Sequence, residues 1–150
     1  MKKISLIIIA IVILSAILVF FSFSAAKQEE FINTVKINDK EIKVEIAKTN
    51  LEQYWGLSGR KNICPDCGML FVSGNKRERN FVMRDMMFPL DIVWIDNEKI
   101  IKIDRDLQPE SSSNLTSYES GKPVDYVLEV NAGFCANNNI KIGDKIWINY

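Results

Sequence analysis

The chain has 150 residues, room for one domain of ordinary size, with 19 basic side chains, 19 acidic side chains and no histidine. Without a basic excess it lacks the charge that draws phosphate backbones, so nucleic acid is not an expected partner. The absence of histidine excludes Ser-His and Cys-His catalysis and histidine-ligated zinc. Any chemistry must therefore use carboxylates, amides, guanidinium groups or thiols.

An apolar segment near the N-terminus predicts export. Residues 4–23 carry no charge, are long enough to cross a bilayer as a helix, and follow two lysines. Because a positive flank stays in the cytoplasm, the rest of the chain is expected outside the cytoplasmic membrane. Residues 24–26 also form a small-residue cleavage site, so two alternatives stay open. Residues 1–26 are either an uncleaved single-pass signal anchor or a signal peptide that leaves a secreted or periplasmic domain.

Residues 27–33 are expected to be a spacer, and residues 34–150 a single β-rich domain. Short apolar or alternating runs bounded by turn residues predict strands at 34–37, 41–47, 68–73, 80–85, 90–96, 99–104, 124–131 and 145–150. Short helices are predicted at 51–57, behind the capping residue Thr49, and within 132–138.

The pattern of elements predicts the fold class. No βαβ alternation is present, so we expect a mainly β (β-rich α+β), mostly antiparallel barrel or sandwich with two short helices. Residues 90–96 are apolar on both faces, which is typical of a central strand covered on both sides. A turn is expected at 74–76 and a long polar loop at 106–122.

Blocks of residues along the predicted domain follow a recognisable order and spacing. They are Gly56-Leu57 with Arg60, Gly68–Phe71, Phe81-x-Met83 with Pro89–Asp91, Ile95-Asp96, Gln108-Pro109, Tyr118, Tyr126–Gly133 and Ile140-x-x-Gly143-Asp144. This series resembles the DUF192 (UPF0127) family of small bacterial and archaeal domains. The resemblance implies a compact, mainly β fold that is commonly exported, and it brings no established activity.

Two segments depart from the family pattern. Residues 82–85 read Val-Met-Arg-Asp where the family typically has Trp-Met-Lys-Asn. A stacking aromatic is therefore absent, the cation is a guanidinium, and a carboxylate replaces an amide. Residues 64–67 read Cys-Pro-Asp-Cys where relatives usually show a Leu-Pro turn.

Asp91 is the first candidate site residue. It begins an otherwise apolar strand, so its carboxylate is expected to be at least half buried and hydrogen-bonded or paired. Arg84 is a candidate partner, because its guanidinium fork suits a carboxylate. Two interpretations stay open: a structural carboxylate that ties the turn at 86–89 to backbone N–H groups, or a ligand-binding or catalytic group.

Glu129 and Asn131 lie two residues apart, hence on one face of their predicted strand. With Gly133, where a backbone can approach closely, they could line a pocket that binds hydroxyl or amide groups. If Glu129 also faced Asp91, the two carboxylates could do acid–base work on a sugar. The alternative is that Glu129 and Asn131 are exposed, with Asn131 capping the helical turn that follows.

Cys64 and Cys67 form the most conspicuous local motif, and Cys135 is the third cysteine. The motif precedes a strand rather than a helix, which is the wrong context for a thioredoxin-type site. A metal site needs about four ligands, so we expect neither a metal nor another cofactor. Outside the cytoplasm a local Cys64–Cys67 disulfide is the simplest outcome. A labile redox pair, a metal site with Asp66 or Cys135, and free thiols stay open.

Three functions follow from these alternatives. The favoured one is a non-enzymatic module at the outer face of the cytoplasmic membrane that binds a small polar ligand between Arg84/Asp91 and Glu129/Asn131. The second is a hydrolase or lyase that acts on cell-envelope carbohydrate through Asp91 and Glu129. The third is a structural or interaction domain, held at the membrane by the N-terminal helix, with an unknown protein partner.

Overall fold

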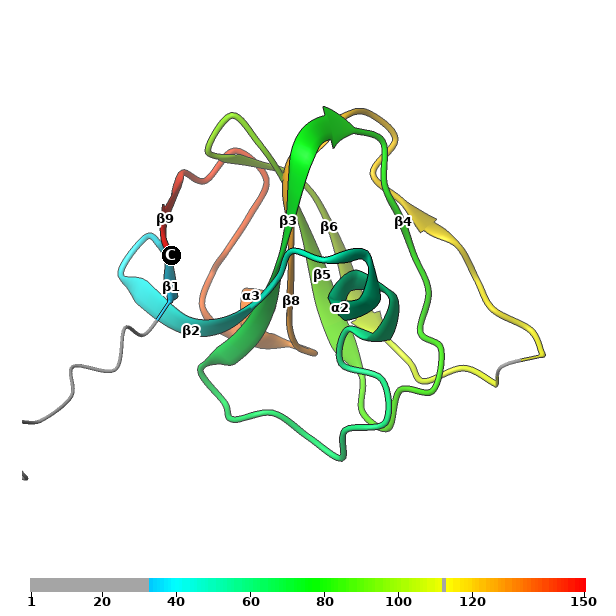
Figure 1. Cartoon of the computed structure of the whole chain (residues 1–150). Coiled ribbons are helices and arrows are strands. Elements are labelled where there is room, and N and C mark those ends of the chain that lie inside the picture. Colours follow the sequence, from blue (N-terminus) through cyan, green and yellow to red (C-terminus); the bar gives the residue numbers. More distant parts are fainter. Residues whose placement is uncertain (1–32, 112) are drawn as a thin grey trace, which may run out of the picture. The chain divides into compact units, whose positions relative to one another are not determined.

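The structure is a computed structural model that describes residues 33–111 and 113–150 (Figure 1). The predicted leader at 1–26 and residues 27–32 of the predicted spacer lie outside the described residues. Among the residues that are described, no helix is long and apolar enough to span a bilayer. Their elements, in chain order, are β1 (Thr34–Ile37), β2 (Lys40–Ala47), α2 (Asn50–Trp55), β3 (Cys67–Arg77), β4 (Asn80–Phe81), β5 (Leu90–Asp96), β6 (Lys99–Leu107), β7 (Tyr118–Glu119), β8 (Val124–Asn131), α3 (Phe134–Asn137) and β9 (Ile146–Asn149).

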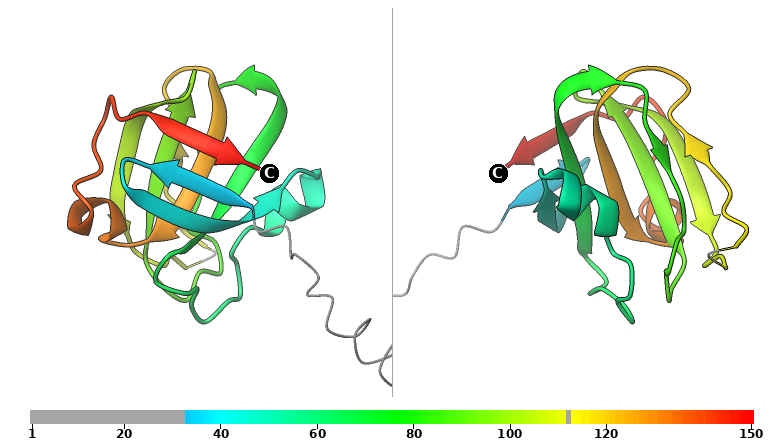
Figure 2. Two further views of the ribbon diagram at one scale, coloured as in Figure 1. Left: turned by 90° about the vertical axis from the view of Figure 1, so that its left-hand side faces the viewer. Right: turned by 45° about the vertical axis from the view of Figure 1, so that its right-hand side comes forward.

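Seven strands form one sheet in the order β6-β5-β8-β3-β2-β1-β9, and β4 pairs with β7 beside it. Neighbours in the sheet are antiparallel except β2 and β3, which are parallel and are joined through α2. The sheet curls, so that β9, β1 and β2 lie across from β5 and β8 (Figure 2). Its two ends meet at one corner, where Ile146 N donates to Glu98 O at 2.9 Å and Ile100 N donates to Asp144 O at 3.0 Å. The expected mainly β fold with two short helices is confirmed, in the form of a half-barrel.

The strands alternate side chains between two apolar cores, one on each face of the sheet. The core inside the curl contains Val35, Ile37, Ile42, Val44, Leu70, Val93, Ile95, Ile100, Leu128, Val130, Phe134, Cys135, Ile140 and Ile146. The core on the outer face contains Ala47, Leu57, Met69, Phe71, Met83, Phe88, Leu90, Ile92, Trp94, Leu107, Val124 and Val127. Strand β5 contributes to both, which confirms that it is covered on both faces, although it lies next to the edge strand β6.

Three local predictions are wrong. The long loop expected at 106–122 is shorter, because β6 runs to Leu107 and the strand β7 lies within the expected loop. The turn expected at 74–76 is part of β3, because the strand continues past an irregularity in its pairing to Arg77, which pairs with Val124 of β8. The strand expected at 80–85 is only the two-residue β4. It cannot continue through Asp85, whose φ of 53° lies in the left-handed region that breaks an extended chain.

The helix α2 follows its sequence signal closely. Thr49 and Glu52 form a reciprocal capping box at its start, in which each side chain accepts a hydrogen bond from the other residue's backbone N–H. The helix ends before Gly56, which has a φ of 48°. In Figure 1 α2 lies in front of the sheet, between β3 and β4. This position makes the helix one wall of the cleft described next.

Candidate functional site

Asp91 is a structural carboxylate. Its side chain is fully buried, and its two oxygens accept three backbone N–H bonds, from Asp106 at 2.9 Å, Gly133 at 3.2 Å and Cys135 at 3.0 Å. These bonds join the end of β6 to the start of α3, so the expected tie to the turn at 86–89 is wrong. The expected pairing with Arg84 is also wrong, because that guanidinium lies at Tyr54.

The register of β5 and β8 separates the two candidate carboxylates. Asp91 lies opposite Val130, and Ile92 lies opposite Glu129. Because successive side chains point to opposite faces, Asp91 lies on the inner face of the sheet and Glu129 on the outer face. The structure therefore does not form the carboxylate pair that the hydrolase or lyase interpretation requires.

A cleft with a cavity volume of about 620 Å³ lies on the outer face. One wall is α2 with the turn that follows it, and the other is the segment from Arg77 to Met86. Phe71 of β3 and Glu129 of β8 belong to its lining from the sheet. The volume is within the usual range for small-molecule sites, about 300–1,000 Å³.

Glu129 is the buried polar group of this cleft. The residue is 6% exposed, and its carboxyl group forms no hydrogen bond to any residue that the structure describes. Burial raises the pKa of Glu129 to about 8, so the group is mostly protonated at neutral pH. The exposed alternative predicted for this residue is wrong, because Met69 and Ile92 flank it on the neighbouring strands. A neutral carboxyl group can donate one hydrogen bond and accept others.

Gly56 keeps the approach to Glu129 open. A Cβ atom at this position would lie 3.2 Å from the ring of Phe71 and 4.0 Å from Oε2 of Glu129. The backbone there has a positive φ, which favours glycine in any case. A side chain at position 56 would therefore narrow the cleft as well as strain the turn.

Two arginines from the far wall are anchored to α2. Arg79 Nη1 donates to Gln53 Oε1 at 3.2 Å, and Gln53 Nε2 donates in turn to Val72 O at 2.8 Å. Arg84 Nη2 donates to Tyr54 O at 2.7 Å, and its guanidinium carbon lies 4.1 Å from the centre of the Tyr54 ring. Burial lowers the pKa of Arg79, with a smaller contribution from the like charge of Arg77. Both guanidinium groups are thus held in place in a partly desolvated cleft.

The family DUF192, described as "Uncharacterized ACR, COG1430", matches residues 32–148. The chain belongs to the DUF192 family. No curated protein is significantly similar to it.

Two solved structures are similar to this DUF192 chain. One is a protein from Sinorhizobium meliloti 1021, described provisionally as a transcription regulator. It is 29% identical, with a TM-score of 0.72, and the match covers 79% of this chain and 95% of that one. The other is a protein of unknown function from Novosphingobium aromaticivorans DSM 12444. It is also 29% identical, with a TM-score of 0.70, and the match covers 77% of this chain and 83% of that one.

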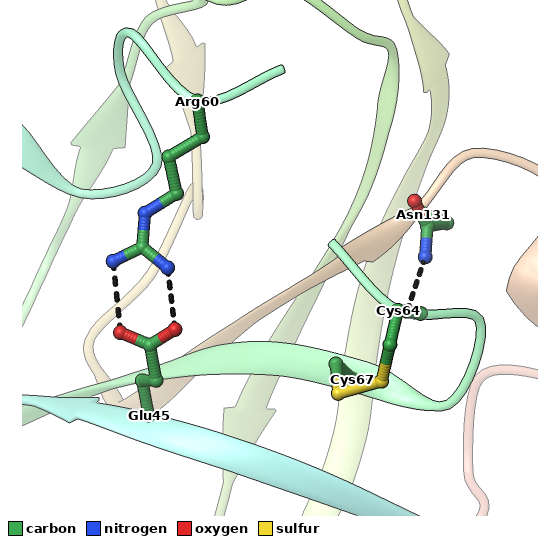
Figure 3. The surroundings of a disulfide bond; sticks show 5 residues. All are labelled: Glu45, Arg60, Cys64, Cys67 and Asn131. Carbon is green, nitrogen blue, oxygen red and sulfur yellow. Dashed lines mark hydrogen bonds and ion pairs between the residues drawn. A yellow bond between two sulfur atoms is a disulfide. The ribbon is translucent and has the colours of Figure 1, made fainter. Parts of the chain in front are cut away.

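Asn131 of this DUF192 domain lies outside the cleft. Its Nδ2 donates to Cys64 O at 2.9 Å, which holds the disulfide loop against the end of β8 (Figure 3). The expected cap on α3 is wrong, because Gly133 occupies the N-cap and no side chain caps the helix. Gly133 instead donates its N–H to Asp91. Of the five predicted ligand-binding residues, only Arg84 and Glu129 line the cleft.

The cysteines of the DUF192 domain form one disulfide and one buried thiol. Cys64 and Cys67 are bonded, with their Cα atoms 5.0 Å apart, and the Arg60–Glu45 ion pair lies nearby (Figure 3). Burial, with a contribution from Asp91, raises the pKa of Cys135 to about 12, so this thiol is unreactive at neutral pH. Within 33–111 and 113–150, no group of three or more His, Cys, Asp or Glu side chains could hold a metal ion.

Most of the cleft lining was not predicted from the sequence, including Gln53, Tyr54 and Arg79. Arg79 lies in the charged run 76–79, a composition typical of an exposed turn. Gln53 and Tyr54 lie on the short helix, where no pattern indicated which side faces the sheet. The one available signal was the family departure at 82–85, because Val82 and Arg84 both line the cleft.

Proposed function

We propose that this DUF192 domain is a non-enzymatic binding module for a small polar ligand, held in the cleft between α2 and the segment 77–86. The observation that carries the proposal is Glu129, a buried carboxyl group that lines the cleft and has no hydrogen-bond partner among the described residues. This carboxyl group is neutral and largely desolvated yet open to the cleft, so it can donate and accept hydrogen bonds with a ligand there. A ligand hydroxyl or amide group would satisfy it.

We expect Glu129→Leu to weaken ligand binding about 10- to 100-fold, because it removes a hydrogen-bonding group that the ligand must satisfy. Glu129→Gln should retain most of the affinity, since an amide has the shape of a neutral carboxyl group and also donates and accepts. The measurement is the rise in melting temperature of the full chain with each member of a panel of sugars, hydroxy acids and amino acids.

Glu41→Leu is the matched control, because Glu41 is exposed at the start of β2 and does not line the cleft. It should bind as the unmodified chain does. If no member of the panel stabilises the unmodified chain, or if Glu129→Leu binds as tightly, the binding function is wrong. The polar residues would then serve only the fold of a membrane-tethered structural domain.

We further propose that the domain lies outside the cytoplasmic membrane, anchored through residues 4–23. The charge-free run behind two lysines supports this location. So does the Cys64–Cys67 disulfide, because cytosolic thiols are kept reduced.

The oxidation state of the cysteines in the cell tests this location. Cells are quenched in acid, denatured and treated with an alkylating reagent that adds mass to each thiol. Export predicts a single alkylated cysteine, Cys135, because Cys64 and Cys67 are already bonded to each other. Three alkylated cysteines in freshly quenched cells would place the domain in a reducing compartment and contradict export.

A further inference from the structure

Two guanidinium nitrogens at the cleft are buried without a partner. Among the described residues, Arg79 Nη2 and Arg84 Nε are inaccessible to solvent and form no hydrogen bond. Both side chains are nevertheless held, because Arg79 Nη1 donates to Gln53 and Arg84 Nη2 donates to Tyr54 O. Buried charged donors are expensive to leave unsatisfied. Because these two nitrogens are closed to solvent, a ligand oxyanion would contact the other nitrogens of the two guanidinium groups that line the cleft.

The charges around the cleft favour an anion. Arg77, Arg79 and Arg84 line it, and the ion pairs within the described segments are Arg60–Glu45, Lys76–Asp96 and Lys102–Asp104, none of which neutralises a cleft arginine. The acids in the lining are Glu78, which is exposed, and the buried Glu129. The cleft therefore presents more positive charge than its own residues balance.

The two kinds of group suit different parts of one ligand. Fixed guanidinium groups bind oxyanions through charge-assisted hydrogen bonds, which are about twice as strong as neutral ones. The carboxyl group of Glu129, which lines the cleft from the sheet, suits a hydroxyl or amide group instead. A bare inorganic anion would offer no hydroxyl or amide group to Glu129, and a neutral sugar would leave the positive charge of the cleft arginines unbalanced.

We infer that the ligand is a small organic anion whose carboxylate or phosphate group binds Arg79 and Arg84 and whose hydroxyl or amide group binds Glu129. This inference rests on the proposed binding function and names the chemical class of its ligand. A carboxylate and a phosphate ester share the oxyanion chemistry that the arginines recognise. Matched compounds that differ only in the anionic group can separate them.

The test is a titration of the ¹⁵N-labelled full chain, followed by the Nε–H signals of its arginines. The probes are glucuronate against glucose, lactate against propane-1,2-diol, glycerol 3-phosphate against glycerol, and inorganic phosphate alone. In at least one pair the anion should bind about 10-fold or more tightly than its neutral partner and shift the Arg79 and Arg84 signals. Carboxylate pairs and the phosphate pair show which oxyanion is preferred.

Arg79→Gln and Arg84→Gln should each lower the affinity for that anion about 10-fold and leave the affinity for the neutral partner unchanged. Arg79→Lys, which keeps a charge and disturbs the fold less, should fall between Arg79→Gln and the unmodified chain. Arg105→Gln is the matched control, because Arg105 also donates to a backbone carbonyl, that of Ile140, but does not line the cleft.

Three other results would contradict the inference, and each has a different consequence for the proposed function. If neutral compounds bind as tightly as their anionic partners and binding still depends on Glu129, the anionic class is wrong and the binding function stands. If inorganic phosphate binds as tightly as the organic anions and Glu129→Leu has no effect, the site takes a bare anion. If none of the compounds binds, the inference and the proposed function fail together.

Discussion

Replacing Asp91 by alanine is expected to lower the free energy of unfolding by about 3–5 kcal/mol, close to the whole stability of a marginal domain. The carboxylate accepts backbone N–H bonds from Asp106, Gly133 and Cys135, and all three donors would lose their partner at once. Each unsatisfied buried donor costs about 1–3 kcal/mol, although water entering the new space offsets part of the sum. Urea unfolding of the variant and the unmodified chain measures the difference.

A second variant, Asp91→Asn, separates the contributions of the two carboxylate oxygens. The asparagine oxygen can replace Oδ1, which accepts two of the three N–H bonds, but its amide group would face the remaining donor from Cys135. We therefore expect about half of the alanine effect. Asp39→Ala, at an exposed turn, should change stability by less than about 0.5 kcal/mol. An alanine effect at Asp91 no larger than this control would show that the carboxylate does not hold β6 and α3 together.

The stability of the domain is expected to fall by about 3 kcal/mol as the pH rises from 5.5 to 8, because of Glu129. The pKa of this group is about 8 in the folded chain, against an ordinary value of 4.5. Between these values the folded state holds a proton that the unfolded state has released, so raising the pH favours unfolding. The loss of stability is complete above the pKa of about 8 in the folded chain, and none of it occurs below the ordinary pKa of 4.5.

Other carboxyl groups do not change the stability of the domain between pH 5.5 and 8. Hydrogen bonds lower the pKa values of Glu45, Glu52, Glu110 and Asp144 in the folded state. Stability from these groups is lost only as the pH falls below their ordinary values, so it is constant above pH 5.5. Denaturant unfolding at several pH values measures the slope, and Glu129→Gln should remove it. A slope that is unchanged in Glu129→Gln would mean that another group carries it.

Much of the fold could be predicted from the sequence, because its strong signals are local. The alternation in β2 and β8, the fully apolar β5 and the capping residue of α2 all form as predicted. The predictions failed where tertiary contacts decide the outcome. The segment 74–76 has turn residues but continues β3, since pairing with β8 resumes at Arg77. The segment after Phe81 has strand-like residues but leaves the sheet, with Asp85 in a left-handed conformation.

The site was less predictable than the fold, for a physical reason. The alternation of side chains along one strand shows which of its residues share a face. Only the pairing register shows whether residues of two neighbouring strands lie on the same face of the sheet. Burial of Asp91 and a pocket at Glu129 could be predicted from each strand alone. Their placement on opposite faces depends on the register of β5 and β8. The contribution of Arg79 depends on the position of α2 over the sheet, which no local pattern records.

The structure shows where the residues that depart from the family pattern at 82–85 lie. Val82 and Arg84 line the cleft, whereas Asp85 lies in the turn beyond it and accepts the Gly59 N–H at 2.8 Å through its backbone oxygen. The valine leaves the cleft without the aromatic side chain that the family typically has there. The arginine keeps the positive charge and adds a planar fork that can hold an oxyanion.

Carbon-13 NMR of the glutamate side-chain carboxyl groups in the full chain observes the proposed site directly. The account predicts that the Glu129 carbon has the shift of a protonated carboxyl group at pH 7 and titrates near pH 8. Adding the organic anion that binds should shift this signal, and in Arg79→Gln the same shift should require about 10-fold more anion. A Glu129 carboxylate that is ionised at pH 7 and unaffected by every compound in the panel would contradict the account.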